Sequence, residues 1–198
     1  MSDTSTVRRT LRLDQRARRL ALDADDQAAA SMAVMARLAR LPILRSADTI
    51  AGYRAVRGEL DVDAALTLLA ERGARITIPR VAGEHLEFVC WDPVDDTTPG
   101  SFGIPEPIGD RTVPLNAHDV VLVPLVAFDA DGHRLGQGGG FYDRALARAT
   151  PRPVVIGIAH SFQQVDSIPT EHWDVPIDAV VTEDHVLEFR PGTFDPAI

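Results

Sequence analysis

Short apolar runs and amphipathic segments alternate along most of this chain. The apolar runs are brief and rich in β-branched residues, which is typical of buried strands. They predict strands at Thr49–Tyr53, Arg75–Pro79, Leu86–Trp91, Val120–Phe128, Pro153–Ala159 and Val180–Thr182, the last of which we expect to be the final strand. No helix separates the second and third runs, so Leu86–Trp91 is expected to be an edge or antiparallel strand.

The segments between these runs repeat with the period of a helix. They predict helices at Thr6–Leu22, capped by Thr6, from Asp23 or Asp25 to Arg40, at Val62–Arg72 before Gly73, and from Tyr142 onward. Residues 92–119 show no clear period and are rich in Pro, Gly and Asp, and loops of this length are usually functional or mobile. Strands that alternate with helices indicate a single α/β domain over residues 1–198.

Charge narrows the classes of function. A formal net charge of −9 argues against general nucleic-acid binding. No lysine occurs, which excludes Schiff-base and lysine-nucleophile mechanisms. Six arginines nevertheless stand against one acid, Asp14, in the first predicted helix, at positions 8, 9, 12, 16, 18 and 19. This local excess suits a polyanionic small ligand.

The single cysteine, Cys90, cannot form an internal disulfide, and its apolar surroundings predict a buried thiol in a reducing compartment. The first residues lack the apolar core of a signal peptide, and no run is long enough to cross a membrane. We therefore expect a cytoplasmic protein that binds neither membranes nor nucleic acid. The six histidines show no metal-ligand spacing.

The most informative stretch is DADGHRLGQGGGFYDR, residues 129–144, which joins a predicted strand to a predicted helix. Glycines at 136, 138, 139 and 140 let the backbone adopt positive φ and bring its N–H groups close to a ligand. The start of the next helix favours an anion such as phosphate. A glycine-rich turn without a ligand is the alternative.

Two common phosphate-binding loops are excluded. A Walker A loop needs a lysine, and the chain has none. The dinucleotide-binding pattern begins at Gly136 and Gly138 but has Phe141 where a third small residue is required.

The segment RLGQGGGFYDR, placed after DADG and a strand, resembles the 5-formyltetrahydrofolate cyclo-ligases, also called methenyltetrahydrofolate synthetases. The resemblance extends more weakly over nearly the whole chain. It implies a three-layer αβα fold with a mostly parallel central sheet. It also implies the closure of 5-formyltetrahydrofolate to 5,10-methenyltetrahydrofolate with ATP and Mg²⁺, releasing ADP and phosphate by way of a phosphorylated formyl oxygen.

The resemblance also assigns residues to ATP. An N-terminal basic pair of this family contacts the phosphates, which points to Arg8 and Arg12 on one helical face. The loop residues expected to bind ATP are Arg134, Gly136, Gly138, Gly139, Gly140, Phe141 and Tyr142. A solvated basic face is the alternative for the two N-terminal arginines.

For the folate, the resemblance points to Glu59, whose carboxylate suits the amino group and ring N–H of a pterin, and to the backbone of Arg54. Phe102, before the family-like segment GIPEP, and Phe141 are the aromatic contacts. Asp143 and Asp178 are predicted Mg²⁺ ligands that meet across strand ends, and Arg134 and Asp143 are the predicted catalytic residues. A solvated or helix-start acid is the alternative for each carboxylate.

Two departures from the family pattern concern affinity. Gly139 stands where some relatives have lysine, and Phe141 where tyrosine is usual.

Two other functions stay open at this point: a different phosphate-binding αβα enzyme, such as a sugar-phosphate isomerase or CoA transferase, and a non-catalytic nucleotide- or folate-binding protein. The expected partners are 5-formyltetrahydrofolate and ATP, and the expected state is a monomer or weak dimer.

Overall fold

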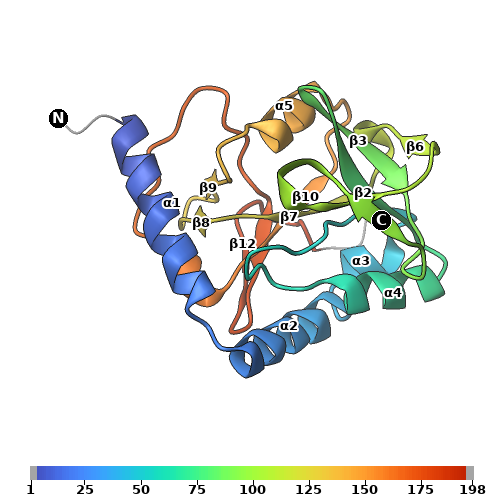
Figure 1. Cartoon of the computed structure of the whole chain (residues 1–198), viewed down its shortest axis with the longest axis horizontal. Helices are drawn as coiled ribbons and strands as arrows, with labels where there is room; N and C mark the ends of the chain where they lie inside the picture. Colours follow the sequence, from blue (N-terminus) through green and yellow to red (C-terminus); the bar gives the residue numbers. More distant parts are fainter. Residues whose placement is uncertain (1–3, 195–198) are drawn as a thin grey trace.

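The computed structural model describes residues 4–194, which are built around an eight-stranded sheet (Figure 1). Its order is β12 (Val186–Glu188), β11 (Ala179–Val181), β10 (Val154–Ile158), β7 (Val120–Pro124), β1 (Thr49–Ala51), β2 (Arg75–Ala82), β3 (His85–Cys90) and β6 (Thr112–Val113). The five strands from β11 to β2 are parallel, whereas β12, β3 and β6 pair antiparallel at the edges. The predicted mostly parallel α/β fold is confirmed, as is the antiparallel pairing of the strand near Leu86.

Helices cover both faces of this sheet, giving three layers (Figure 1). One face carries α2 (Ala24–Leu38), α3 (Pro42–Ser46) and α4 (Asp63–Glu71); the other carries α5 (Phe141–Arg148) and the hairpin of β8 (Ala127–Phe128) and β9 (Arg134–Leu135). Alternate residues of β7 pack into two hydrophobic cores, one on each face of the sheet. Val120 and Leu122 face α2 and α4, and Val121 and Val123 face α5. Burial on both faces explains why this strand reads as a continuous apolar run.

The first helix, α1 (Thr4–Leu20), stands beside the sheet and contacts β8. Thr6 lies inside this helix, so the prediction that it caps the helix is wrong. Asp23 does cap α2, because its carboxylate accepts a hydrogen bond from the N–H of Asp26 at 2.8 Å. α3 was not predicted, since Pro42 reads as a stop although it serves here as the first helical residue.

The predicted strand Val120–Phe128 divides in two. Pro124 ends β7, because it has no N–H to continue the ladder. The carbonyl oxygens of Leu125 and Val126 then accept hydrogen bonds from the Gln163 side chain at 2.8 Å each. The chain turns there, and Ala127–Phe128 pairs with β9 instead of extending the main sheet.

Two further differences concern the irregular parts of the chain. The final strand is β12, not the predicted 180–182. The long connection contains β6, the hairpin β4 (Thr97–Pro99) and β5 (Pro105–Pro107), and the short 3-10 turns Ser101–Gly103 and Leu115–Ala117. Glu106 closes this hairpin, because its buried carboxylate accepts from the N–H groups of Ser101 and Val81.

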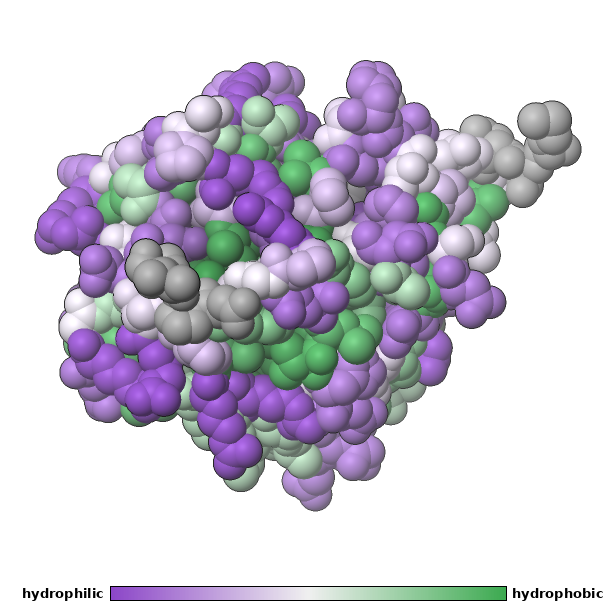
Figure 2. Space-filling view, turned by 180° about the vertical axis from the view of Figure 1, so that it is seen from behind, coloured by the Kyte–Doolittle hydropathy of each residue, from purple (hydrophilic) through white to green (hydrophobic). Residues whose placement is uncertain are grey.

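Among the helices of the described residues, none is both long and apolar enough to cross a membrane. From behind, the surface is largely hydrophilic, with hydrophobic residues gathered around the lower middle of the view (Figure 2).

Candidate active site

The glycine-rich loop lies at the edge of the sheet where the parallel strands end, and it leads into the first turn of α5. Gly138 has φ 108° and Gly140, the residue before the helix, has φ 65°. Side chains are disfavoured at such positive angles, so the turn requires glycine at both positions. A Cβ at Gly139 would lie 2.8 Å from the Phe141 ring. A larger residue at position 139 would therefore displace this ring.

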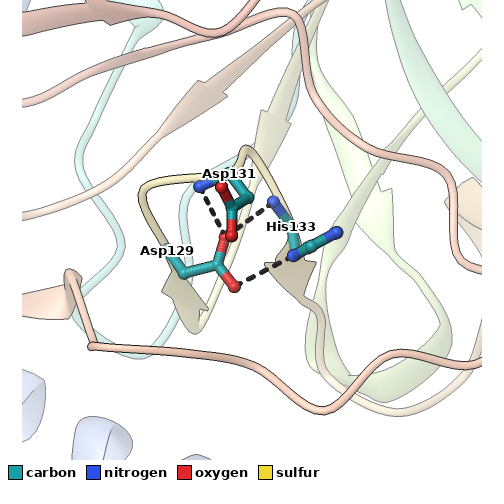
Figure 3. A group of neighbouring side chains, drawn as sticks. All are labelled: Asp129, Asp131 and His133. Carbon is teal, nitrogen blue, oxygen red and sulfur yellow. Dashed lines mark hydrogen bonds and ion pairs between the residues drawn. The ribbon is translucent and has the colours of Figure 1, made fainter.

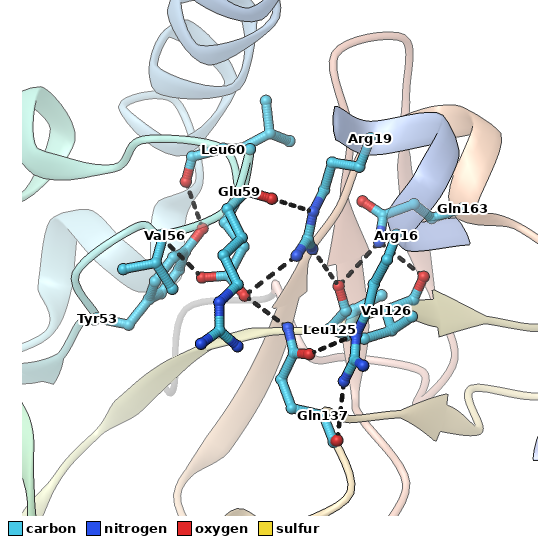
Figure 4. A network of polar contacts seen from close by, with 12 residues as sticks. Arg16, Arg19, Tyr53, Val56, Glu59, Leu60, Leu125, Val126, Gln137 and Gln163 are labelled. Carbon is cyan, nitrogen blue, oxygen red and sulfur yellow. Dashed lines mark hydrogen bonds and ion pairs between the residues drawn. The ribbon is translucent and has the colours of Figure 1, made fainter. Parts of the chain in front are cut away.

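Arginines of α1 hold this loop in place. Arg12 Nε donates to the carbonyl oxygen of Gly136 at 2.9 Å, and Arg16 donates to both the carbonyl and the side-chain oxygen of Gln137 at 2.9 Å. Arg19 is buried and donates to the carbonyl oxygens of Arg57 and of Leu125, the residue after β7 (Figure 4). The helix therefore fastens the glycine loop to the end of the central strand.

The sequence interpretation missed Arg16, Arg19 and Gln137 as site residues. A signal existed for the two arginines, because positions 12, 16 and 19 share one helical face. Gln137 offered no such signal. Arg12 keeps two terminal nitrogens without a partner among the described residues, close to Gly138.

Glu59 is the buried acid of this network. Its carboxylate accepts from Gln137 Nε2 at 3.0 Å and from the N–H of Val56 at 3.2 Å, and lies 3.6 Å from Arg19 Nη2 (Figure 4). Burial raises the pKa of the Glu59 carboxyl above its ordinary value, although Arg19 counteracts the shift. An acid desolvated in this way is available to pair with N–H donors of a ligand.

The Tyr142 hydroxyl is a buried polar group without a partner. It makes no hydrogen bond within residues 4–194. Burial raises the pKa of the Tyr142 phenol, and the negative charge of Glu59 raises it further. The phenol therefore stays neutral and can donate a hydrogen bond. A buried hydroxyl without a partner carries a desolvation cost that a ligand or a water molecule could relieve.

This observation gives a first prediction. Tyr142→Phe should leave the melting temperature unchanged or slightly raised, because it removes an unpaired buried hydroxyl. If the hydroxyl meets a substrate, kcat/KM should fall about tenfold in the same variant. Thermal melts and steady-state kinetics measure the two effects. Unchanged kinetics would show that Tyr142 is only a core residue.

Arg134 and Asp143 form the charged pair beside the loop. Arg134 is buried, donates to Asp143 Oδ1 at 2.7 Å and also donates to the carbonyl oxygen of Val175. The N–H of Val175 donates to the same Asp143 oxygen at 3.2 Å. Within the described residues no donor reaches Asp143 Oδ2, and this side chain is 23% exposed. Asp143 can therefore offer one oxygen to a divalent cation next to the glycine loop, which fits Mg²⁺ held by one carboxylate, phosphates and water.

Asp178 does not join this pair, contrary to the expectation that both carboxylates meet. It precedes β11, at the edge where the parallel strands begin, and its Oδ2 accepts from the N–H of Val155 at 2.8 Å. Its Oδ1 pairs with Arg152 and lies 3.6 Å from Arg190 Nη1. The carboxylate is 2% exposed and fixes the starts of β10 and β11. The reason is topological: a residue before a parallel strand lies at the opposite edge from the loops that follow such strands.

Two other predicted residues, Arg8 and Arg54, have side-chain partners of their own. Arg8 forms a two-point contact with Asp174 and donates to the carbonyl oxygen of Pro169. Arg54 Nη1 pairs with Asp63 at 2.5 Å, and the guanidinium lies 5.1 Å from the Trp91 ring centre, so the side chain is held away from the glycine loop by neighbours of its own.

Phe102 is 63% exposed, and its ring meets that of Phe141 edge to face at 6.0 Å. It has φ 60°, and its carbonyl oxygen accepts from Arg57, which has φ 53°. Two non-glycine residues with left-handed backbones in contact are uncommon, and such positions often belong to functional sites.

The DADG segment, residues 129–132, builds a turn. Asp129 is buried and accepts from the N–H groups of Asp131 and His133 and from His133 Nδ1, at 3.0–3.1 Å (Figure 3). It also accepts from the N–H of Ile168 at 3.0 Å. Asp129, Asp131 and His133 are close enough to hold a metal ion. The oxygens of Asp129 are nevertheless used by the turn, so we assign them a structural role.

Comparison with known proteins identifies the family of the chain. A sequence model of the 5-formyltetrahydrofolate cyclo-ligase family matches residues 4–183. The 5-formyltetrahydrofolate cyclo-ligase of Escherichia coli K12 is 36% identical over 180 residues, covering 88% of this chain and 99% of the relative. That of Haemophilus influenzae is 36% identical over 176 residues, covering 86% of this chain and 94% of the relative.

Solved structures give the same result. The 5,10-methenyltetrahydrofolate synthetase of Aquifex aeolicus superposes with a TM-score of 0.83 at 31% identity, covering 97% of this chain and 96% of that one. The synthetase of Mycoplasma pneumoniae superposes with a TM-score of 0.75 at 28% identity, covering 89% and 98%. With the family match over residues 4–183, these relatives show that this chain belongs to the 5-formyltetrahydrofolate cyclo-ligase family.

Proposed function

We propose that this enzyme closes 5-formyltetrahydrofolate to 5,10-methenyltetrahydrofolate in a reaction that consumes ATP, requires Mg²⁺ and releases ADP and phosphate. The observation that carries the proposal is the pairing of a positive-φ glycine loop with Asp143, whose Oδ2 is free of donors from residues 4–194. Such an arrangement suits a phosphate tail beside a divalent ion. Family membership over most of the chain speaks against a sugar-phosphate isomerase, a CoA transferase or a non-catalytic binder.

The substrate defines the chemical problem. A formamide oxygen is a poor leaving group, so N10 cannot displace it unaided. Transfer of the γ-phosphoryl group to this oxygen turns it into a good leaving group. N10 then attacks the formyl carbon, and loss of phosphate leaves the methenyl bridge. The protein needs no nucleophile of its own for this sequence, because alignment and charge neutralisation provide the catalysis.

The residues would divide these tasks by position. The N–H groups of residues 136–142 and the free nitrogens of Arg12 would hold the triphosphate. Asp143 would hold Mg²⁺, which supplies positive charge to the phosphates when bound. Arg134 would orient Asp143 through their hydrogen bond, as a positioning residue.

The folate would lie on the side of the glycine loop opposite to the triphosphate. Glu59 would accept hydrogen bonds from the amino group and ring N–H of the pterin. These pterin donors would replace Gln137 Nε2, which donates to Glu59 in this structure. Phe102 and Phe141 would cover the flat ring system. This arrangement would bring the formyl group toward the phosphates.

An absorbance assay tests the function, because methenyltetrahydrofolate absorbs at longer wavelength than 5-formyltetrahydrofolate. We expect product only when enzyme, ATP and Mg²⁺ are all present, and EDTA should abolish turnover until Mg²⁺ is restored. Stoichiometric ADP should accompany the product. Turnover without ATP, or none under any condition, would contradict the proposal.

A further inference from the structure

Trp173 is an exposed aromatic side chain that has no part in the site described above. Of the Phe, Trp and Tyr side chains among residues 4–194, only Phe102 and Trp173 are more than half exposed. Phe102 contacts the Phe141 ring and is assigned to the folate. Single exposed apolar side chains are normal on protein surfaces, so exposure alone does not indicate a ligand. The position of Trp173 in the fold does.

The segment that carries Trp173, residues 169–175, is fastened to α1 and runs beside this helix (Figure 1). Arg8 of α1 donates to the carbonyl oxygen of Pro169 at 3.2 Å and forms a two-point contact with Asp174. Asp174 Oδ2 also accepts from the N–H of Glu171 at 2.8 Å, which closes the segment on itself. Trp173 therefore stands on a fixed piece of backbone next to a helix rich in arginine.

The other end of the segment is fastened to the charged pair beside the glycine loop. The N–H of Val175 donates to Asp143 Oδ1 at 3.2 Å, and its carbonyl oxygen accepts from Arg134. Trp173 is two residues from Val175, so their Cα atoms are at most about 7 Å apart. The indole is thus anchored next to the carboxylate that we assign to Mg²⁺ and the phosphates.

One face of this indole is open. The His172 ring meets the Trp173 ring at an interplanar angle of 74°, with the ring centres 4.5 Å apart. A T-shaped contact of this kind covers at most one face of the indole, and Trp173 stays 56% exposed. A flat ligand can therefore stack on the other face without displacing a side chain of the core.

We propose that Trp173 is the platform on which the adenine ring of ATP stacks. This inference deepens the proposed function and rests on its use of ATP. Glu59, assigned to the pterin, contacts the glycine loop at Gln137, whereas residues 169–175 contact Asp143 at the other end of the loop. With the γ-phosphate directed toward the formyl group, the ribose and base extend away from Glu59 toward Trp173. Stacking of a base on an aromatic side chain contributes about tenfold or more to affinity.

Kinetics of Trp173 variants test the platform. Trp173→Ala should raise the KM for ATP about tenfold, with kcat and the KM for 5-formyltetrahydrofolate unchanged. Trp173→Phe keeps an aromatic face and should restore the KM for ATP to within about threefold of the native value. Val94→Ala is the matched control, because Val94 is an exposed apolar residue between β3 and β4, and its KM for ATP should not change.

Tryptophan fluorescence gives a readout that does not depend on turnover. The chain has two tryptophans, and the other, Trp91, is only 5% exposed. ADP should quench the emission of the native protein, because a stacked purine quenches an indole, and Trp173→Phe should lose this response. Inorganic triphosphate, which has no base, should leave the emission unchanged. Calorimetry should show that Trp173→Ala binds ADP about tenfold more weakly but inorganic triphosphate as tightly as the native protein does.

The outcomes separate this inference from the function itself. An unchanged KM for ATP in Trp173→Ala, or an equal loss of affinity for ADP and inorganic triphosphate, would overturn the platform while the function stands. A native protein whose emission does not respond to ADP would also overturn it. If ADP quenches the native protein as expected but no methenyltetrahydrofolate forms with ATP and Mg²⁺, the proposed function fails and the base site remains.

Discussion

Asp143→Asn should lower kcat about 100-fold or more, while the free energy of unfolding changes by no more than about 1 kcal/mol. The amide keeps an oxygen that can accept from Arg134 and from the N–H of Val175, so the local structure should survive. It loses the negative charge that would hold a divalent ion near the glycine loop. Initial rates over a range of Mg²⁺ concentrations, together with urea unfolding, measure both effects.

Asp178→Asn is the matched control for this experiment. Asp178 is also a paired carboxylate, but its partners lie at the opposite edge of the sheet. We expect the reverse result: a loss of about 2 kcal/mol in the free energy of unfolding, because Arg152 loses its buried partner, with kcat of the folded protein retained. A normal kcat in Asp143→Asn would remove Asp143 from the metal site.

Glu59→Gln should lower kcat/KM for the folate about 100-fold, mainly through KM. A glutamine offers one acceptor and presents an amide donor toward the donors of the pterin, so the complementary pair is lost. Glu183→Gln provides the control, because both carboxylate oxygens of Glu183 accept hydrogen bonds from Ser161 on another loop, and its folate kinetics should stay unchanged. Equal KM values in Glu59→Gln and the native protein would contradict the assignment.

The same residue should produce a pH dependence. Because burial raises the pKa of Glu59, this carboxyl takes up its proton at higher pH than an exposed glutamate does. The native kcat/KM should therefore fall as pH decreases through the raised pKa, and Glu59→Gln should lack this decline. Folding stability has the opposite pH dependence. The stability that protonated Glu59 provides at low pH is lost as the pH rises through the raised pKa. Ligand N–H groups would then recover part of the cost of the buried charge.

Local chemistry explains which parts of the fold could be predicted. Strands such as Val120–Pro124 can be predicted from the sequence, because a strand buried on both faces requires an unbroken apolar run. Asp23 could be recognised as a helix cap because its partner is three residues away. Thr6 and the final strand were misjudged because the boundaries of elements depend on contacts that a local pattern does not contain.

The sequence alone determined four things: the glycine loop, the absence of lysine, the family and the α/β class. Each depends on residue type or on short spacing along the chain. The partners of the charged groups were decided only by the tertiary structure. Arg8 pairs with Asp174 across 166 positions, Gln137 with Glu59 across 78, and Arg134 with Val175 across 41. The separation of Asp143 from Asp178 likewise depends on which edge of the sheet each strand end occupies. Burial and topology bring such residues together or keep them apart, and neither is encoded in any short stretch of sequence.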